Sequence, residues 1–339
     1  MTPSTRPNAL IVMSPSAFRA QFDHDRLDRL ADLTTLAEPI WTDNLDSPEL
    51  LGRLASVDIL LTGWSAPALT DERLNRMPNL RAMFHCAGSV RYVVTDAFWE
   101  RNIVASNAAD ANAIPVAEYT LAAIIFAGKK APFLAADARV FREDWGYAQR
   151  RGELSNRGRT IGIVGFSRVG RRVVSLVQQL DPVTCLVADP YADPAEVAAA
   201  GATLVSLAEM LPRVDVLSLH APALPGTHHM IDAKELAALP DHATVINTAR
   251  GSLINTQALE FECATGRISA ILDVSDPEPL PASSVLYDLP GVMITPHIAG
   301  SMGSELHRMT DAALDELGRY VQGLELVAEL SSENLRLSA

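Results

Sequence analysis

A glycine-containing turn between an apolar run and a helical pattern is the clearest chemical signal in this sequence. Residues 161–170 read IGIVGFSRVG. This is the context of a dinucleotide-binding fingerprint, in which one glycine makes the tight turn and another lets the helix pack closely on the strand. A pyrophosphate would then sit on the free N–H groups of the helix N-terminus. The predicted cofactor contacts of this turn are Gly165, Ser167, Arg168, Val169 and Gly170.

Two residues refine this prediction. Ser167 stands at the middle position, where glycine normally lets the backbone approach the phosphate, so its Cβ should push a cofactor outward unless the hydroxyl forms a hydrogen bond. Asp189 ends the next predicted strand, 24 residues after Gly165. A carboxylate there can accept both ribose hydroxyls and repel a 2′-phosphate, and no arginine follows to hold NADP. We therefore predict NAD, the alternative being a carboxylate that only ends its strand.

Composition limits what else the protein could be. The 339 residues suffice for about two domains, and 48% hydrophobic with 20% charged residues is typical of globular proteins. A net charge of −13 argues against nucleic acid or anionic lipid as a partner. Cys86, Cys185 and Cys263 show no metal-ligand spacing, and the longest apolar run, 121–127, is short for a membrane span. We expect a soluble cytoplasmic protein with buried thiols, no metal and no membrane partner.

Short apolar runs alternate with amphipathic patterns in the first part of the chain, which predicts βαβ units and a parallel sheet. The expected strands are 9–13, 57–62, 80–86 and 103–106. The expected helices are 25–31, 48–55, 71–77 and 96–101.

A second alternation begins at Thr160. Its expected strands are 160–164, 183–188, 203–205, 214–218, 244–247, 270–274 and 292–295, with helices over 168–180 and 194–200. Many of these strands are apolar throughout, as expected when both faces of a sheet are covered.

Two further helical patterns connect the halves. Residues 113–127 are almost entirely apolar, and we expect a helix that crosses between domains, buried in the fold or at a subunit interface. The pattern over 303–321 follows the last strand and can return to the first domain. The expected organisation is a domain over 1–110, completed by 302–339, with a second domain over 111–301 inserted in it.

Several motifs in the second half closely resemble the D-isomer-specific 2-hydroxyacid dehydrogenase family. They are VINTARG at 245–251, LDV at 272–274 with EPLP at 278–281, and TPHIAGS at 295–301. VDV at 214–216, HAP at 220–222 with Thr227, residues 113–118 and Trp145-Gly146 also match. The resemblance runs from about Leu80 to Gly303, and its motifs occur in the family's order. It implies an α/β protein with two doubly wound parallel sheets, a Rossmann-type NAD-binding domain inserted into a flavodoxin-like substrate domain.

The resemblance implies a catalytic triad of Arg250, Glu278 and His297. Arginine presents a planar fork of donors that can hold a substrate carboxylate and the C2 oxygen together. Histidine can exchange the hydroxyl proton, and a glutamate bonded to it would fix its orientation and favour its imidazolium form. Taken singly, an arginine after a strand is usually a surface charge and an isolated histidine is usually structural. The set of motifs makes the catalytic interpretation the stronger one.

The resemblance also assigns binding roles. The further cofactor contacts are His220, Ala221, Pro222, Thr227, Thr248, Ala249, Asp273, His297 and Ala299. Asp273 resembles the family residue near the nicotinamide carboxamide, although it could simply end its strand. The substrate contacts are Ala87, Gly88, Ser89, Arg250, His297 and Ser301.

The substrate loop departs from the family. Where the family usually has Gly-Val-Asp, this chain reads Ser89-Val90-Arg91. Arg91 could meet an acidic substrate or lie in solvent, and Trp64 could wall the pocket or lie in a core or interface. These alternatives stay open at the level of sequence.

The expected activity is NADH-linked reduction of a small 2-keto acid to its D-hydroxy acid, by a homodimer. Glyoxylate or hydroxypyruvate is the first guess because both are compact. A short-form phosphoglycerate dehydrogenase is one alternative, and a redox-inactive NAD-sensing protein on the same fold is another. Formate dehydrogenases are related but carry glutamine in the triad, which Glu278 argues against.

Overall fold

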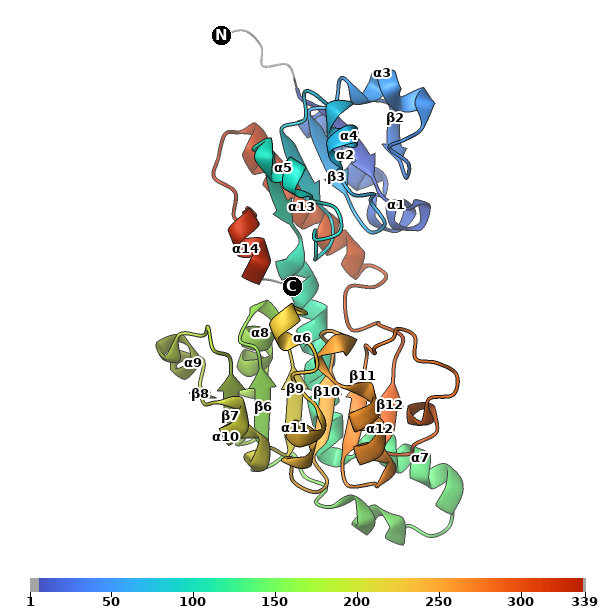
Figure 1. The fold of residues 1–339 in the computed structure, drawn as a ribbon, viewed down its shortest axis with the longest axis vertical. Helices are drawn as coiled ribbons and strands as arrows, with labels where there is room; N and C mark the ends of the chain where they lie inside the picture. The colour runs from blue at the N-terminus through green and yellow to red at the C-terminus, as the bar shows by residue number, and fades with distance from the viewer. Residues whose placement is uncertain (1–5, 338–339) are drawn as a thin grey trace. The chain divides into compact units, whose positions relative to one another are not determined.

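The computed structural model describes residues 6–337, which fold as two compact units. One unit takes the described residues up to Asn112 together with those from Ser301 on, and we call it the terminal unit. The other, Ala113–Gly300, we call the central unit. Figure 1 labels the elements of both.

The terminal unit contains a five-stranded parallel sheet with the strand order β2-β1-β3-β4-β5. This is the flavodoxin-like order. The strands are β1 (Asn8–Val12), β2 (Thr35–Thr42), β3 (Ile59–Thr62), β4 (Ala82–His85) and β5 (Val104–Asn107). The helices are α1 (Pro15–Gln21), α2 (His24–Leu33), α3 (Leu51–Leu54), α4 (Asp71–Asn75), α5 (Asp96–Glu100), α13 (Glu305–Val321) and α14 (Ser332–Leu337).

Successive residues of these strands enter two different cores, because side chains alternate across a sheet. Ile11, Leu61 and Phe84 share one core with α1, α2 and α13. Leu10 and Leu60 share the other with α3, α4 and α5. Helix α13 thus returns the end of the chain to the sheet of its beginning (Figure 1).

Three elements of this unit were not predicted, namely β2, α1 and α14. Strand β2 contains Pro39 and is mostly half-buried or exposed, so it lacks an apolar run. Proline is tolerated there because β2 lies at the sheet edge, and its register with β1 shifts between Ala9 and Ile11. Helix α1 begins after Ser14, whose side chain accepts a hydrogen bond from the Ala17 N–H, so the Ser-Pro pair starts a helix.

The central unit contains a seven-stranded parallel sheet with the order β12-β11-β10-β9-β6-β7-β8. The strands are β6 (Thr160–Val164), β7 (Thr184–Ala188), β8 (Thr203–Leu204), β9 (Val216–Leu219), β10 (Thr244–Asn247), β11 (Ser269–Leu272) and β12 (Val292–Ile294). The strand order reverses between β6 and β9, which makes a topological switch point. The predicted fold class, two doubly wound parallel sheets with a Rossmann-type domain, is confirmed.

Helices cover both faces of this sheet. The helices are α6 (Ala109–Lys129), α7 (Ala131–Phe141), α8 (Arg168–Val177), α9 (Pro194–Ala199), α10 (Leu207–Met210), α11 (Ala233–Ala237) and α12 (Thr256–Ala264). Ile163, Val187 and Ile246 pack in one core with α6 and α8. Leu217 and Val245 pack in the other with α10, α11 and α12.

Helix α6 is long and apolar enough, by length and composition, to cross a membrane. Its most apolar window is 56% buried inside the protein, and Ala123, Ile124 and Ala127 belong to the core of the central unit. Its role as a buried core helix therefore accounts for its composition.

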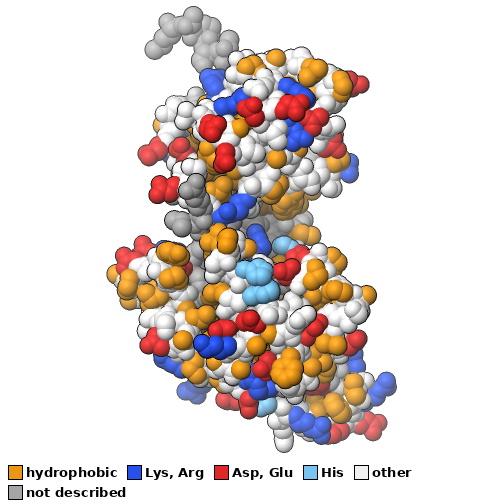
Figure 2. All heavy atoms as spheres, viewed as in Figure 1, with side chains coloured by type: hydrophobic (Ala, Val, Ile, Leu, Met, Phe, Trp, Pro, Cys, Tyr) orange, Lys and Arg blue, Asp and Glu red, His pale blue; other side chains and the backbone are white. Residues whose placement is uncertain are grey.

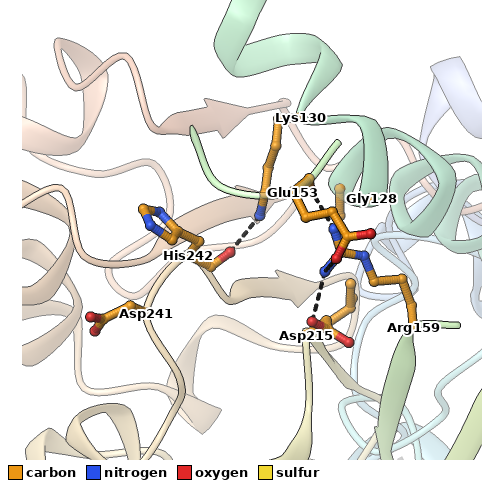
Figure 3. Close-up of a pocket in the computed structure, with 9 residues that line it drawn as sticks. Gly128, Lys130, Glu153, Arg159, Asp215, Asp241 and His242 are labelled. Carbon is orange, nitrogen blue, oxygen red and sulfur yellow. Dashed lines mark hydrogen bonds and ion pairs between the residues drawn. The ribbon is translucent and has the colours of Figure 1, made fainter. Parts of the chain in front are cut away.

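A small hollow of about 210 Å³ lies at the amino ends of β6, β9 and β10, the sheet edge opposite to that where strands end (Figure 3). The Lys130 side chain is buried there, and its Nζ donates to the His242 carbonyl and to Thr244 Oγ1 at 2.8 Å. Burial lowers the pKa of Lys130 from 10.5 to about 8; the cation of Arg159 adds to this shift and Asp215 opposes it. The charged form of Lys130 therefore lowers the stability of the folded protein.

We expect stability to rise with pH because of Lys130. Below pH 8 the lysine is charged in both states and the full penalty is present. Between pH 8 and 10.5 the folded protein releases the proton while the unfolded chain keeps it, so the penalty falls. From pH 7.5 to 9.5 wild type should gain about 2 kcal/mol in free energy of unfolding relative to Lys130→Met, as measured by denaturant titration.

Lys129→Met is the matched control, because Lys129 is the neighbouring residue, at the end of α6, and is exposed. The difference between wild type and this control should not change with pH. A pH-independent difference for Lys130→Met would contradict the shifted pKa.

Candidate functional site

Three neighbouring strands of the central sheet are followed by two predicted catalytic residues, Arg250 and His297, and by Asp273, a predicted cofactor contact. Arg250 lies three residues after β10, Asp273 directly follows β11, and His297 lies three residues after β12. Parallel strands end at the same edge, so the sheet order β12-β11-β10 places these residues side by side. Residues separated by up to 47 positions in sequence thus share one edge.

His297 is held by Glu278. Its Nδ1 lies 2.6 Å from Glu278 Oε1, and the two side chains are 51% and 43% exposed. The backbone of His297 is left-handed, with φ at 56°. Because Nδ1 is engaged by the carboxylate, Nε2 is the nitrogen left to exchange a proton with another molecule. The structure brings these two predicted triad members together.

The loop that carries His297 is held by the carboxylate of Asp273. Asp273 is 2% exposed and accepts three hydrogen bonds. They come from Thr295 Oγ1 at 2.6 Å, the Ile298 N–H at 2.8 Å and the Ala299 N–H at 2.8 Å. The carbonyl of Asp273 also accepts the His297 N–H at 2.9 Å. Asp273 is therefore a positioning residue for His297, a role that the sequence did not predict.

Tyr119 of α6 extends this network. Its hydroxyl lies 2.7 Å from Thr295 Oγ1. Since the single hydroxyl proton of Thr295 is donated to Asp273, Tyr119 must donate to Thr295. Burial raises the pKa of Tyr119; the hydrogen bond with Thr295 opposes that rise and the charge of Asp273 adds to it. Neither Tyr119 nor Thr295 was in the predicted site, because their roles depend on contacts distant in sequence.

The turn that presents Arg250 is fixed by Asn247, the last residue of β10. The Asn247 amide donates to the Arg250 carbonyl at 2.9 Å and accepts from the Ala249 N–H at 3.1 Å. Burial lowers the pKa of the Arg250 guanidinium, and the charge of Glu278 opposes that shift. The Arg250 Nη1 donates to the Ala249 carbonyl at 2.6 Å, which leaves the other donors of the fork for a ligand. The buried Asn247, a side-chain cap directly after a strand, is a signal that could have been found in the sequence.

The glycine turn after β6 lies at the topological switch point. Gly165 has φ at 96°, and a Cβ there would lie 2.7 Å from the Ala221 backbone nitrogen. At Gly170 a Cβ would lie 2.0 Å from the Gly165 carbonyl oxygen. Only glycine fits at either position, so β6, α8 and the loop after β9 can approach closely.

The N-terminus of α8 and the neighbouring His220 fit a bound nucleotide. Ser167 is the N-cap but makes no capping hydrogen bond; its Oγ lies 3.4 Å from the His220 carbonyl oxygen. The first N–H groups of α8 are therefore free of a side-chain cap and open to an anion. His220 is buried, and its Nε2 contacts Ser218 Oγ at 2.9 Å while its Nδ1 has no partner within the described residues. Burial lowers the pKa of His220 to about 3, so this orphaned group is neutral.

Asp189 lies at the end of β7, beside this turn. Its carboxylate accepts the Phe166 N–H at 2.8 Å and the Tyr191 N–H at 2.9 Å. One lone pair on each oxygen remains for further donors. A hollow of about 720 Å³ adjoins it, lined in part by Pro190, Val205 and Leu207. Its size and apolar walls fit an adenosine group.

Two predicted cofactor contacts, Thr227 and Thr248, form hydrogen bonds within the protein around this site. The Thr227 hydroxyl donates to the Pro222 carbonyl at 2.6 Å and closes the loop that follows His220. The Thr248 hydroxyl lies 2.9 Å from that of Thr120 and joins β10 to α6. The two hydroxyl groups therefore stabilise the segments that surround the site. Arg168 and Val169 lie in the first turn of α8.

The predicted substrate loop belongs to the terminal unit. The Ala87 carbonyl accepts the Ala108 N–H at 3.0 Å, and the Gly88 carbonyl accepts the Asn107 amide at 2.7 Å. Ser89 follows in the same loop. Ser301 is buried, and its N–H donates to Asn112 Oδ1 at 2.9 Å.

The structure bears on the open alternatives for Arg91 and Trp64. Arg91 donates to the Leu335 carbonyl, so its guanidinium fastens the C-terminal segment onto the terminal unit. Trp64 is 38% exposed, which excludes the core alternative.

These features define an NAD-binding domain of Rossmann type with a hydrogen-bonded histidine and glutamate at its strand ends. Residues 124–299 match the family model described as D-isomer specific 2-hydroxyacid dehydrogenase, NAD binding domain. The chain therefore belongs to the D-isomer-specific 2-hydroxyacid dehydrogenase family, as the sequence predicted. The predicted cofactor, NAD, is confirmed.

Several relatives illustrate the similarity. The chain is 32% identical over 296 residues to D-3-phosphoglycerate dehydrogenase of Mycobacterium tuberculosis, covering 84% of this chain and 54% of that protein. It thus spans about half the length of this relative. It is 34% identical over 251 residues to (S)-sulfolactate dehydrogenase of Chromohalobacter salexigens, covering 73% and 80%. The D-mandelate dehydrogenase of Rhodotorula graminis has the same fold, with a TM-score of 0.81 at 22% identity over 96% of this chain and 98% of that one.

Asp273→Asn should loosen the His297 loop. The amide would turn a donor toward groups that are themselves donors, at a cost of about 1–3 kcal/mol. Hydrogen–deuterium exchange of a peptide over 296–300 should become about 5- to 150-fold faster. Asp276→Asn is the control, since its carboxylate makes no hydrogen bond within the described residues. Equal exchange in Asp273→Asn and wild type would refute the positioning role.

Proposed function

We propose that this protein transfers a hydride between NAD(H) and C2 of a small 2-keto or D-2-hydroxy acid. The observation that carries the proposal is the His297–Glu278 pair, joined at 2.6 Å at the strand edge from which Arg250 also projects. A nucleotide site on the same unit would supply the hydride donor or acceptor.

Arg250 would bind the substrate. Its guanidinium keeps its charge at any physiological pH and carries donors in a planar fork. The fork can hold the substrate carboxylate and the neighbouring C2 oxygen at once, which orients C2 and polarises its carbonyl. The Asn247 bonds fix the backbone from which this side chain reaches out.

His297 would exchange the proton. In reduction, Nε2–H gives its proton to the C2 oxygen as negative charge develops there; in oxidation, neutral Nε2 removes the hydroxyl proton. Glu278 accepts the Nδ1–H bond, which sets the tautomer and stabilises the imidazolium. The Asp273 bonds to the backbone on both sides of His297 keep Nε2 in place.

The nucleotide would be held by groups already described. The free N–H groups of α8 would take the pyrophosphate, and Asp189 would take the ribose hydroxyls. Because a 2′-phosphate would meet the Asp189 carboxylate, we propose that NADH is preferred to NADPH.

The proposed substrate is a compact acid of the glyoxylate or hydroxypyruvate kind. The alternative, a short-form phosphoglycerate dehydrogenase, is favoured by the 32% identity to the mycobacterial enzyme of that name. A phosphorylated substrate needs a second cationic site. Arg91 is the arginine of the substrate loop, and its guanidinium donates to the Leu335 carbonyl. The intact His297–Glu278 pair speaks against a redox-inactive NAD sensor.

Purified protein should consume NADH, followed by absorbance, with one or more 2-keto acids from glyoxylate to phenylpyruvate. The compact acids should be the best substrates, and NADPH should support much slower turnover. Best activity with 3-phosphohydroxypyruvate would favour the alternative. NADH binding without consumption of any acid would favour the sensor, and equal rates with both cofactors would refute the role of Asp189.

His297→Ala tests the mechanism. Loss of the acid–base group should lower kcat by about 10² to 10⁴ while NADH affinity, measured by fluorescence, persists. His242→Ala is the control, since this histidine lies at the opposite sheet edge. Near-normal turnover in His297→Ala would remove His297 from the mechanism.

We further propose a homodimer formed through the central unit. Phe126 on α6 and Val140 and Phe141 on α7 are exposed, as is Trp145 just beyond, with exposures of 38–80%. Exposed large apolar groups in one segment are typical of an interface. Sedimentation at micromolar concentration should give twice the 36.5 kDa chain mass. The Trp145→Ser variant should dissociate into monomers at a higher protein concentration than wild type. A monomeric mass for wild type would refute the dimer.

A further inference from the structure

Three potential metal ligands meet at the surface of the central unit, outside the site already described. They are His228, His229 and Asp276, and their ligand atoms all lie within 4.8 Å of one another. The two imidazole rings lie against each other, tilted by 31°, with centroids 3.8 Å apart. Figure 2 shows a group of histidine side chains at the surface of this unit. Asp276 is 47 residues from His229 in sequence, so no short motif announces the cluster.

These three side chains are not used elsewhere. Within residues 6–337, none of them takes part in a hydrogen bond or an ion pair, and the two histidine rings contact each other. His229 and Asp276 are nevertheless half-buried. Their ligand atoms are not among the fully buried unpartnered atoms of the described residues, so an ion from solvent can reach them.

The backbone at the cluster is already fixed. The His229 N–H donates to the Ser252 carbonyl at 2.8 Å, and Thr256 Oγ1 donates to the Asp276 carbonyl at 2.6 Å. Ligands of a tetrahedral zinc ion lie about 3.3 Å apart, given metal–ligand distances near 2.0–2.1 Å. Side-chain rotations alone can therefore close the cluster around an ion. It lines a hollow of about 590 Å³ that leaves room for water as a further ligand.

We propose that His228, His229 and Asp276 bind a divalent cation of the zinc type. Two imidazole nitrogens and one carboxylate oxygen suit a borderline ion such as Zn²⁺ better than Mg²⁺ or Ca²⁺, which prefer oxygen ligands throughout. The sequence predicted no metal, because only the fold brings Asp276 to the two histidines.

The site has a consequence for the proposed function, on which this second part rests. Asp276 precedes Glu278 by two residues, and Glu278 holds His297 at 2.6 Å. A cation bound by Asp276 would fasten this segment to His228 and His229, in the loop that continues from the nucleotide site. Occupancy of the site therefore restrains Glu278 and lowers turnover.

Binding is tested with protein that carries no histidine tag. Zn²⁺ is titrated in competition with a chromophoric chelator, and wild type should take up one ion per chain. His229→Asn and Asp276→Asn should each weaken binding by at least about tenfold. Asparagine suits position 229 because it tolerates the left-handed backbone there, φ 50°. His24→Asn removes an exposed imidazole on α2 and should bind Zn²⁺ like wild type.

The outcomes separate the two parts. Equal Zn²⁺ affinity in wild type, His229→Asn and Asp276→Asn would overturn the site. If Zn²⁺ slows NADH consumption in wild type and His24→Asn but much less in His229→Asn, the coupling to Glu278 is supported. Equal inhibition of all variants would overturn that coupling. Should the protein consume NADH with no acid at all, the proposed function fails while the binding result still stands.

Discussion

The buried carboxylate of Asp273 is the interaction on which the arrangement of the candidate site depends. A charge that is only 2% exposed is costly to bury unless hydrogen bonds replace its water. Here a threonine hydroxyl and two backbone N–H groups do so, and all three belong to the segment 295–299. The same bonds that stabilise the charge therefore fix the loop on which His297 stands, in a left-handed backbone that would otherwise be unfavourable.

The central sheet determines which residues lie beside the Asp273 carboxylate. Asp273 directly follows β11, a buried strand that lies between β10 and β12. Its backbone is therefore held in place by this strand. Arg250 and His297 leave the two neighbouring strands, and the nucleotide site forms where the order reverses between β6 and β9. Gly165 and Gly170 let β6, α8 and the loop after β9 approach closely at this point, since a Cβ at either position would collide with backbone atoms. One sheet edge thus carries both the His297–Glu278 pair and the candidate nucleotide site.

The two units differ in how closely they follow the family. The family model covers 124–299, which lies within the central unit. The substrate loop of the terminal unit carries Arg91 where the family usually has an acid, and this arginine fastens the C-terminal segment. The candidate triad and nucleotide-binding residues therefore lie in the unit that the family model covers, whereas the predicted substrate loop lies in the other.

Much of this protein could be predicted from its sequence. Apolar runs bounded by polar residues identified every strand of the central unit, with β6 and β10 correct at both ends, because buried parallel strands must be apolar throughout. The glycine turn, Asp189 and the triad residues were also accessible, since each lies in a short local pattern. Strand β2 and helix α1 were not, because an edge strand with proline and a seven-residue helix have weak local signals.

Tertiary structure alone decided how these residues act on one another. The sequence gave Asp273 a place near the cofactor, whereas the fold makes its carboxylate the anchor of the His297 loop. It left Arg91 between solvent and substrate, whereas the fold bonds it to Leu335. The sequence did not predict the contact between Tyr119 and Thr295 or the cluster of His228, His229 and Asp276. Local propensity and motif spacing act within a few residues, but these contacts join positions that only the closed sheet brings together.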